Sequence, residues 1–252
     1  MEPPLEITTD TQGIRLLKLN RPTALNALSR ALAAAIVDAL VAAEAAPEVH
    51  AIVLSGSGER AFCAGIDLAE ASVLTVAEIA PWFTLISNCY RQIMLVNKPV
   101  IVALNGVAAG AGYQMALVGD WRIGHSRTRL LQPEINVGLP SIMGAYLMGF
   151  HLSASLNQEL SYTGRIMHAE ECRRHSLLNE LVTPEEFHDA THARALALAA
   201  LSPSAFRATK ARFRAQVLAG FEEARLAAIE GMEAAYAAGE PQAQMARFLT
   251  PD

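Results

Sequence analysis

The sequence has few cysteines and no cluster of basic residues, and each of these absences excludes a class of protein. Its three cysteines, Cys63, Cys89 and Cys172, form no CxxC pair, which argues for a reducing compartment and against a disulfide framework or a zinc site. The formal net charge is −5, whereas general nucleic-acid binding requires a surplus of Lys and Arg to neutralise phosphates. We therefore expect no metal and no nucleic-acid partner.

Long apolar runs and targeting signals are also missing. The longest apolar stretches are rich in alanine and interrupted by charge, and none reaches the roughly 20 residues that a membrane helix needs. The N-terminus, MEPPLEITTD, has no basic region followed by an apolar stretch, so it resembles neither a secretion signal nor a mitochondrial presequence. These features predict a cytoplasmic protein without a membrane span.

Apolar residues are abundant instead. They make up 52% of the chain, against 18% charged residues, which is an apolar composition for a soluble monomer and suggests surface covered by other subunits. The length of 252 residues allows one long domain or a domain with an appendage.

The first half of the chain alternates strand and helix patterns. Strand-like runs at Leu5–Thr9 and Ile14–Leu19 predict a hairpin, and Ser29 is placed to cap a helix that ends near Ala45. The further expected elements are a strand at Ala51–Ser55, a helix at Val76–Val96, a strand at Val100–Leu104, a short helix at Gly112–Val118 and strands at Trp121–Gly124 and Arg129–Leu131.

Helical periodicity dominates from about Ser141, with one strand-like break at Leu177–Val182. After Pro184 only helices are expected, at Glu185–Leu201, Pro203–Leu218 and Phe221–Ala238, followed by a short terminal piece. The pattern predicts an α/β core over residues 1–184 and a helical appendage over residues 185–252. The appendage must bury its apolar stripe, and a neighbouring subunit is one place for it.

Two segments place glycines directly after a strand, where the chain turns tightly and backbone N–H groups can point into a cleft. They are AFCAGIDL at residues 61–68 and NGVAAGAGYQ at residues 105–114. Two such turns can supply a pair of donors to one developing oxyanion, although tight packing alone is an alternative. A dinucleotide fingerprint fits poorly because Met115 occupies the third glycine position, and no P-loop motif occurs.

A third segment, LQPEINVGLP at residues 131–140, places Glu134 among apolar neighbours. Such a setting raises the pKa of a carboxyl group toward the range of a general acid or base. A structural acid held in a salt bridge is the alternative.

Other polar residues carry weaker signals. His188 and His192 are four residues apart on an expected helix, but no third ligand accompanies them, so a solvated helix face is the simpler interpretation. Cys63 beside the first turn is interpreted as a small packing residue rather than a nucleophile, and Asp120 as a residue that fixes a turn.

The segments NRPTALNAL, AFCAGIDL, KPVIVALNGVAAGAG and LQPEINVGLP occur in this order along the chain. Their combination and spacing resemble the crotonase (enoyl-CoA hydratase/isomerase) superfamily. The resemblance implies a spiral of ββα units with a C-terminal helical region that forms a homotrimer or a dimer of trimers. It also implies an acyl-CoA thioester as substrate, so coenzyme A enters with the substrate and no separate cofactor is expected.

The resemblance further implies roles for particular residues. The thioester oxygen would be held by the backbone N–H groups of Ile66 and Ala111. Coenzyme A would lie near Ala64, Asp67 and Leu68.

The C-terminus departs from the family pattern. Phe248 matches an aromatic position of the family, but the lysine often found beyond it is missing here, so Lys210 or Arg247 would have to substitute. Tyr113 is a candidate for the acyl pocket or for the core.

The acidic residues decide between reactions. Hydratases of the family use two glutamates; Glu134 matches the second, but Gln114 occupies the first position, and an amide cannot accept a proton near neutral pH. Ser141, Ile142 and Met143 should narrow the place of a reacting water. We therefore expect a Δ3,Δ2-enoyl-CoA isomerase-type double-bond shift with Glu134 as single acid/base. The alternatives are enoyl-CoA hydration, another enolate reaction such as decarboxylation or thioester hydrolysis, and a non-catalytic scaffold that binds CoA.

Overall fold

A computed structural model describes residues 2–249 of the chain, apart from the side chain of Phe248. Its strands form two sheets, one of six strands in the order β1-β2-β3-β5-β7-β10 and one of four in the order β4-β6-β8-β9. The strands are β1 (Leu5–Thr9), β2 (Ile14–Leu19), β3 (Ala51–Gly56), β4 (Ala61–Cys63), β5 (Val100–Leu104), β6 (Val107–Ala109), β7 (Trp121–His125), β8 (Arg129–Leu131), β9 (Ile166–His168) and β10 (Glu180–Val182).

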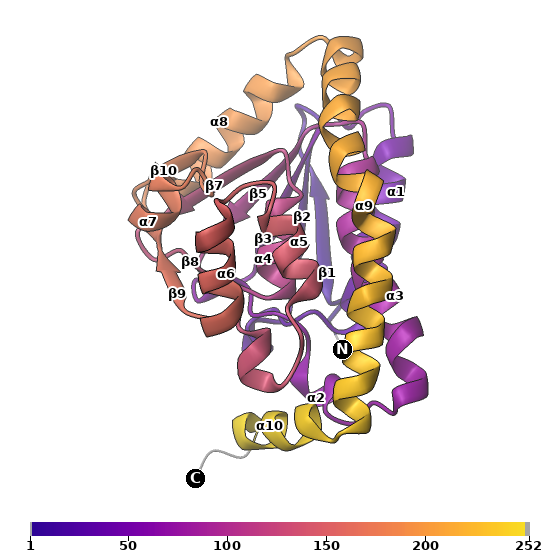
Figure 1. Cartoon of the computed structure of the whole chain (residues 1–252). Helices are drawn as coiled ribbons and strands as arrows, with labels where there is room; N and C mark the ends of the chain where they lie inside the picture. Colours follow the sequence, from indigo (N-terminus) through magenta and orange to yellow (C-terminus); the bar gives the residue numbers. More distant parts are fainter. Residues whose placement is uncertain (1, 250–252) are drawn as a thin grey trace.

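Helices separate and cover these strands (Figure 1). The helices are α1 (Arg30–Ala45), α2 (Leu68–Ala71), α3 (Val76–Leu95), α4 (Ala111–Leu117), α5 (Ile142–Met148), α6 (Ala154–Thr163), α7 (Ala169–Arg174), α8 (Phe187–Ala199), α9 (Pro203–Ala237) and α10 (Glu240–Leu249), with short 3-10 turns η1 (Pro22–Ala24) and η2 (Glu134–Val137).

The two sheets grow by a repeated unit of two strands followed by helix. In each unit the first strand joins the large sheet and the second joins the small sheet, so that β3, β5 and β7 lie next to one another and so do β4, β6 and β8. Within each set the neighbours are parallel. The chain therefore winds as a spiral of ββα units, and the predicted crotonase-type α/β fold is confirmed.

Local sequence explains the first helix. The Ser29 side chain accepts a hydrogen bond from the backbone N–H of Leu32 at 3.2 Å, which confirms the predicted cap. Leu32, Ile36 and Leu40 recur at helical spacing on one face of α1, and all three are fully buried. That face packs against α3 and fixes the helical layer over the core.

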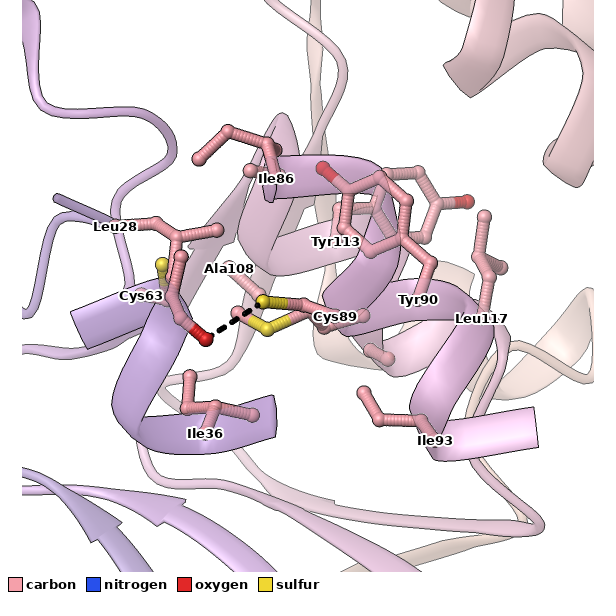
Figure 2. Packing of buried hydrophobic residues seen from close by; sticks show 14 of the residues in the cluster. Leu28, Ile36, Cys63, Ile86, Cys89, Tyr90, Ile93, Ala108, Tyr113 and Leu117 are labelled. Atoms are coloured by element: carbon pink, nitrogen blue, oxygen red, sulfur yellow. Dashed lines mark hydrogen bonds between the residues drawn. The ribbon is translucent and has the colours of Figure 1, made fainter. Parts of the chain in front are cut away.

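The core between α1, α3 and α4 is tightly filled (Figure 2). All three cysteines are free and buried. Cys89 on α3 donates a hydrogen bond from its thiol to the carbonyl oxygen of Ala33 on α1 at 3.3 Å, which is drawn as a dashed line in Figure 2. The thiols therefore serve as packing residues in this region.

Helix α9 corrects the expectation of two helices that meet near residue 220. Gly220 lies inside one continuous helix of 35 residues, although glycine costs about 1 kcal/mol in a helix interior. A side chain at this position would approach the Tyr146 hydroxyl oxygen to 3.0 Å, and this hydroxyl donates to the carbonyl oxygen of Val217. The glycine thus lets α5 dock on α9 rather than ending the helix.

Two short strands also differ from the sequence pattern. The segment Ile166–His168 lies where helical periodicity dominates but forms β9, which pairs antiparallel with β8. The strand predicted over Leu177–Val182 is limited to Glu180–Val182, because the backbone N–H groups of Leu177 and Leu178 donate to the carbonyl oxygen of Cys172 on α7 instead of to a neighbouring strand. Both strands lie at sheet edges, where few pairing contacts reinforce the local pattern.

The helical appendage packs on its own chain. Figure 1 shows α9 running along one side of the molecule, where it packs against α3. Its buried residues Phe221, Ala228, Met232 and Tyr236 belong to the main core cluster, and the Tyr236 hydroxyl donates to the carbonyl oxygen of Ala71 at 2.8 Å. These four residues of α9 are thus covered by the same chain, whereas Phe213 on the first half of the helix is 68% exposed. No helix among the described residues is long and apolar enough to cross a membrane.

Candidate active site

The two glycine turns leave the same edge of the small sheet. Strands β4 and β6 are parallel neighbours, with Ala61 opposite Val107 and Cys63 opposite Ala108. The chain segments that follow them therefore leave the sheet side by side. Ile66 from the first turn and Ala111 from the second both line one cavity of about 370 Å³.

Five described parts of the chain enclose this cavity: the two turns, helix α3, the segment from Leu131 to Gly144, and helix α9. The wall consists of Ala64, Gly65, Ile66, Leu68, Trp82, Phe83, Tyr90, Ala109, Gly110, Ala111, Gln114, Leu131, Pro133, Glu134, Asn136, Val137, Leu139, Pro140, Ser141, Met143, Gly144, Ala228 and Met232. Most of these side chains are apolar, so the few polar groups among them stand in a largely water-excluding wall.

Two residues of the wall, Ile66 and Ala111, have backbone N–H groups for which the described part of the chain supplies no acceptor. Ala111 is the first residue of α4, and the first N–H groups of a helix have no acceptor within the helix. Ile66 forms a β-bridge with Leu28. The two hydrogen bonds of this bridge join Leu28 to the carbonyl oxygen of Gly65 and to the N–H of Asp67, so the Ile66 N–H takes no part in them. Among residues 2–249 neither N–H group has an acceptor, which leaves both available to an oxygen in the cavity.

Glu134 is the carboxylate of this cavity. It lies in η2, and its Oε1 accepts a hydrogen bond from Gln114 Nε2 at 2.8 Å, while its buried Oε2 has no partner among the described residues. Burial raises the pKa of the Glu134 carboxyl to about 7, against the smaller opposing effect of its hydrogen bonds. The group can therefore both accept and release a proton near neutral pH.

The second turn is shaped to bring its backbone close to this carboxylate. Gly110 has a φ of 48°, a left-handed conformation that glycine adopts without a steric penalty. A side chain there would come within 3.0 Å of Glu134 Oε1. No cation of the described residues pairs with Glu134, and the causes of its pKa shift include no charged partner. The interpretation of Glu134 as a salt-bridged structural acid is therefore wrong.

Of the three residues expected near coenzyme A in the first turn, two line the cavity and one does not. Ala64 and Leu68 line the cavity. Asp67 does not, because one carboxylate oxygen caps α2 through the N–H groups of Ala69 and Glu70 and the other pairs with Arg21 at 2.7 Å. Its side chain fixes the first turn in place.

Lys210 also lies outside the cavity wall. Its Nζ is 2.6 Å from Asp120 Oδ2 and donates to the carbonyl oxygen of Lys98 at 3.1 Å, and the residue is buried. Within this chain it therefore holds α9 to the core instead of reaching the cavity. Asp120 also accepts from the N–H of Val100 at 2.8 Å, which ties the turn to β5.

The C-terminal candidates do not contribute to the described wall. Arg247 is exposed on α10 and is not among the residues that line the cavity. The side chain of Phe248 lies outside the described part of the chain.

Some of the residues expected in the acyl pocket line the cavity, and others lie in the core. Met143 lines the cavity and Gln114 does as well. Tyr113 points instead into the core, where it is 1% exposed and lies near Leu117 and Tyr90 (Figure 2). Ile142 packs against the core cluster outside the wall.

Several wall residues carry no sequence signal that marks them as part of a site. Trp82 and Tyr90 come from α3, and Ala228 and Met232 come from α9. Their helical spacing indicates only that they face inward, because the same spacing serves a filled core and a cavity wall. Burial raises the pKa of the Tyr90 hydroxyl well above its usual value.

The weaker candidates serve structural roles. His192 Nε2 lies 2.8 Å from Asp10 Oδ2, and residues 2–249 contain no group of three His, Cys, Asp or Glu side chains that could hold a metal. Cys63 is fully buried, and burial raises the pKa of its thiol to about 12. Such a thiol is almost entirely protonated at neutral pH and is a poor nucleophile.

Comparisons with known proteins identify relatives of this chain. Residues 9–249 match the family model described as enoyl-CoA hydratase/isomerase. Carboxymethylproline synthase of Pectobacterium carotovorum is 32% identical over 95% of this chain and 96% of its own length, and crotonyl-CoA hydratase of Syntrophomonas wolfei is 34% identical over 69% and 68%. The crystal structure of an enoyl-CoA hydratase from Mycobacterium smegmatis is similar with a TM-score of 0.82 and 30% identity, covering 98% of this chain and 96% of the other.

The chain belongs to the enoyl-CoA hydratase/isomerase family, within the crotonase superfamily. It is an enzyme of that family. The names of these relatives describe hydratases and a synthase, so they do not support the expected preference for isomerisation.

Proposed function

We propose that the protein converts an acyl-CoA thioester through an enolate, with Glu134 as the single acid/base and a double-bond shift from C3 to C2 as its reaction. The observation that carries this proposal is the pair Gln114 and Glu134, in which one amide and one carboxylate meet at 2.8 Å beside two unpaired N–H groups. Coenzyme A would enter along Ala64 and Leu68, which line the cavity.

Enolate formation needs a base and a place for negative charge. Glu134 Oε2, which has no partner within the described residues, takes a proton from C2 of a 3-enoyl-CoA. The electron pair of the broken C–H bond moves through C2 to the thioester oxygen, and the N–H groups of Ile66 and Ala111 stabilise the resulting oxyanion. Donors that are fixed before the reaction stabilise such charge without reorganisation, and removal of one typically costs roughly 10²–10³-fold in rate.

Return of the proton completes the shift. Protonated Glu134 delivers the proton to C4 of the extended enolate, which restores the carbonyl, places the double bond at C2 and regenerates the carboxylate. A carboxyl group with a pKa of about 7 suits both steps, because it gains and loses a proton at similar free energy near neutral pH. No second carboxylate is required.

Addition of water to a 2-enoyl-CoA requires two proton transfers at different atoms. An attacking water must lose a proton as it bonds to C3, while C2 gains one, and a second carboxylate divides these tasks. Gln114 stands in that place and directs its Nε2 toward Glu134, so its amide serves as a donor rather than a base.

A second candidate reaction is capture of the enolate by a carbon electrophile. The relative that covers 95% of this chain is named carboxymethylproline synthase. An acetyl thioester enolate that attacks a carbon electrophile adds a two-carbon unit, and hydrolysis of the thioester then leaves a carboxymethyl group. Loss of CO2 from malonyl-CoA yields the same enolate without a base.

One experiment separates these reactions. The purified protein is incubated with 3-hexenoyl-CoA, crotonyl-CoA and malonyl-CoA, and product masses and double-bond position are followed over time. The proposal predicts conversion of 3-hexenoyl-CoA to the 2-enoyl isomer with little hydration of crotonyl-CoA. Hydration at tens of turnovers per second, an ordinary rate for an enzyme, would contradict the double-bond shift as the main reaction. Release of CO2 from malonyl-CoA without isomerisation would favour the second candidate.

A further inference from the structure

Two polar side chains of the cavity wall have no hydrogen-bond partner among the described residues, and the proposed reaction does not use them. Trp82 on α3 is 3% exposed, and its indole Nε1 has no hydrogen-bond acceptor within the described residues. Ser141 lies between η2 and α5, and its shielded Oγ likewise has no partner there. Both residues line the same cavity as Glu134.

Such groups are unfavourable in an apolar wall. A buried N–H or O–H group without an acceptor costs roughly 1–3 kcal/mol. These two atoms already have almost no water-accessible surface, so a plain alkyl chain in the cavity leaves that cost in place. A ligand that returns an acceptor avoids it. Ser141 makes no capping hydrogen bond to α5, so its hydroxyl does not serve the helix N-terminus.

The charge of the cavity wall further restricts the class of ligand. The wall contains the carboxylate of Glu134 but no Lys, Arg or His side chain among the described residues. An anionic acyl group would therefore be buried without a counter-ion and close to a carboxylate, which is costly. A neutral oxygen, as in a ketone, ester or amide, can accept from both donors without that penalty.

We propose that the acyl pocket selects CoA thioesters whose acyl group carries a neutral oxygen acceptor, bound by the indole N–H of Trp82 and the hydroxyl of Ser141. This inference rests on the proposed function, since it assigns the cavity to the acyl group. Trp82 and Ser141 are specificity-determining residues in this scheme, whereas Glu134 performs the proton transfer.

Binding of saturated acyl-CoA esters tests the inference without turnover of a double bond. Dissociation constants are measured by calorimetry for hexanoyl-CoA, 4-oxohexanoyl-CoA and 5-oxohexanoyl-CoA, which share a chain length, and for adipoyl-CoA, which ends in a carboxylate. At least one keto ester should bind about tenfold more tightly than hexanoyl-CoA, the effect expected of about one buried hydrogen bond. Adipoyl-CoA should bind no more tightly than hexanoyl-CoA.

Variants assign the preference to the two donors. Trp82→Phe and Ser141→Ala should each reduce the ratio of keto-ester affinity to hexanoyl-CoA affinity toward unity, and Ser141→Thr, which retains a hydroxyl, should preserve that ratio. Trp121→Phe is the matched control, because the Trp121 indole donates to Glu180 at 2.6 Å away from the cavity wall.

The outcomes separate this inference from the proposed function. Equal binding of hexanoyl-CoA and both keto esters, or tighter binding of adipoyl-CoA, would overturn the inference and leave the acyl-CoA site intact. A preference for a keto ester that survives both Trp82→Phe and Ser141→Ala would also overturn it. Failure of every thioester to bind would instead remove the proposed function itself.

Discussion

Gln114 Nε2 donates a hydrogen bond to Glu134 Oε1 over 2.8 Å, from the helix after the second glycine turn to the 3-10 turn across the cavity. The bond leaves Glu134 Oε2 as the free oxygen of the carboxylate within the described part of the chain. It also stabilises the charged form, so the pKa of Glu134 is lower than burial alone would make it. Gln114 is thus a positioning residue for the base, and we expect its chemistry to decide what the base can do.

Replacement of Gln114 by Glu tests that role. A second carboxylate next to Glu134 would repel it and favour its protonated form, so the pH at which the isomerase rate is half-maximal should rise by at least about one unit. Hydration of crotonyl-CoA should increase only slightly, because Met143 narrows the space for water. The profile is measured from about pH 5 to about pH 10, with Gln114→Met as the uncharged control. An unchanged midpoint in Gln114→Glu would contradict the contact as described.

Glu134 should also leave a mark on stability. The pKa of its carboxyl is about 7 in the folded protein, against 4.5 for an ordinary glutamate side chain such as that of the unfolded chain. Between these values the folded state binds more protons, so this group stabilises the fold fully below pH 4.5 and the contribution is lost as pH rises to about 7.

The variant Glu134→Gln lacks that titration. Its free energy of unfolding relative to the wild type should therefore increase with pH between 4.5 and about 7, by about 3 kcal/mol in total. Urea unfolding of both proteins across this range measures the difference, in which the other titrating groups cancel. A difference that stays constant with pH would show that the folded pKa is not raised.

The Lys210–Asp120 pair is expected to serve stability rather than CoA binding. Lys210→Met leaves the partly buried Asp120 carboxylate without its cation, and loss of one partner from such a pair costs about 3 kcal/mol. The dissociation constant for an acyl-CoA should change less than about twofold. Lys18→Met is the control, since Lys18 pairs with Glu6 at the surface and such pairs contribute about 1 kcal/mol or less. Unchanged stability with weakened CoA binding in Lys210→Met would reverse this assignment.

Assembly into trimers remains a prediction, and the structure suggests where to test it. Phe150 and Phe213 are 45% and 68% exposed, and both line a second cavity of about 560 Å³ next to Lys210. Large exposed apolar groups that gather in this way are typical of protein interfaces. Sedimentation at micromolar concentration should show a trimer or hexamer for the wild type and dissociation for Phe213→Glu. A stable wild-type monomer would contradict the prediction.

Local sequence predicts the parts of the fold that depend on short-range patterns. The Ser29 cap, the buried stripe of α1 and the glycine turns are readable because each is fixed by a few adjacent residues. The continuity of α9 cannot be predicted in this way. The low helix propensity of Gly220 indicates a break, whereas the packing of Tyr146 against Gly220 involves a helix that is distant in the sequence.

The same limit applies to the site. Glu134 and Gln114 are identifiable from motifs, and the structure brings them together. Trp82 and Met232 escape prediction because nothing local distinguishes a helix face that lines a cavity from one that fills a core. The pairing of Lys210 with Asp120 also escapes prediction, because the two residues lie ninety positions apart in the sequence. Motifs thus predict the reacting groups, whereas the groups that shape the pocket require the tertiary structure.

The central claim is that Glu134 removes a proton from C2 of a bound thioester. Exchange of the C2 hydrogens of 4-oxohexanoyl-CoA and hexanoyl-CoA in D2O, followed at C2 by proton NMR, measures that step independently of any later reaction. The wild type should catalyse exchange, with a rate that rises through a midpoint near a pH of about 7, and Glu134→Gln should reduce it by about 10²-fold or more while retaining acyl-CoA binding. Exchange by Glu134→Gln at the wild-type rate, with both thioesters bound, would contradict the account.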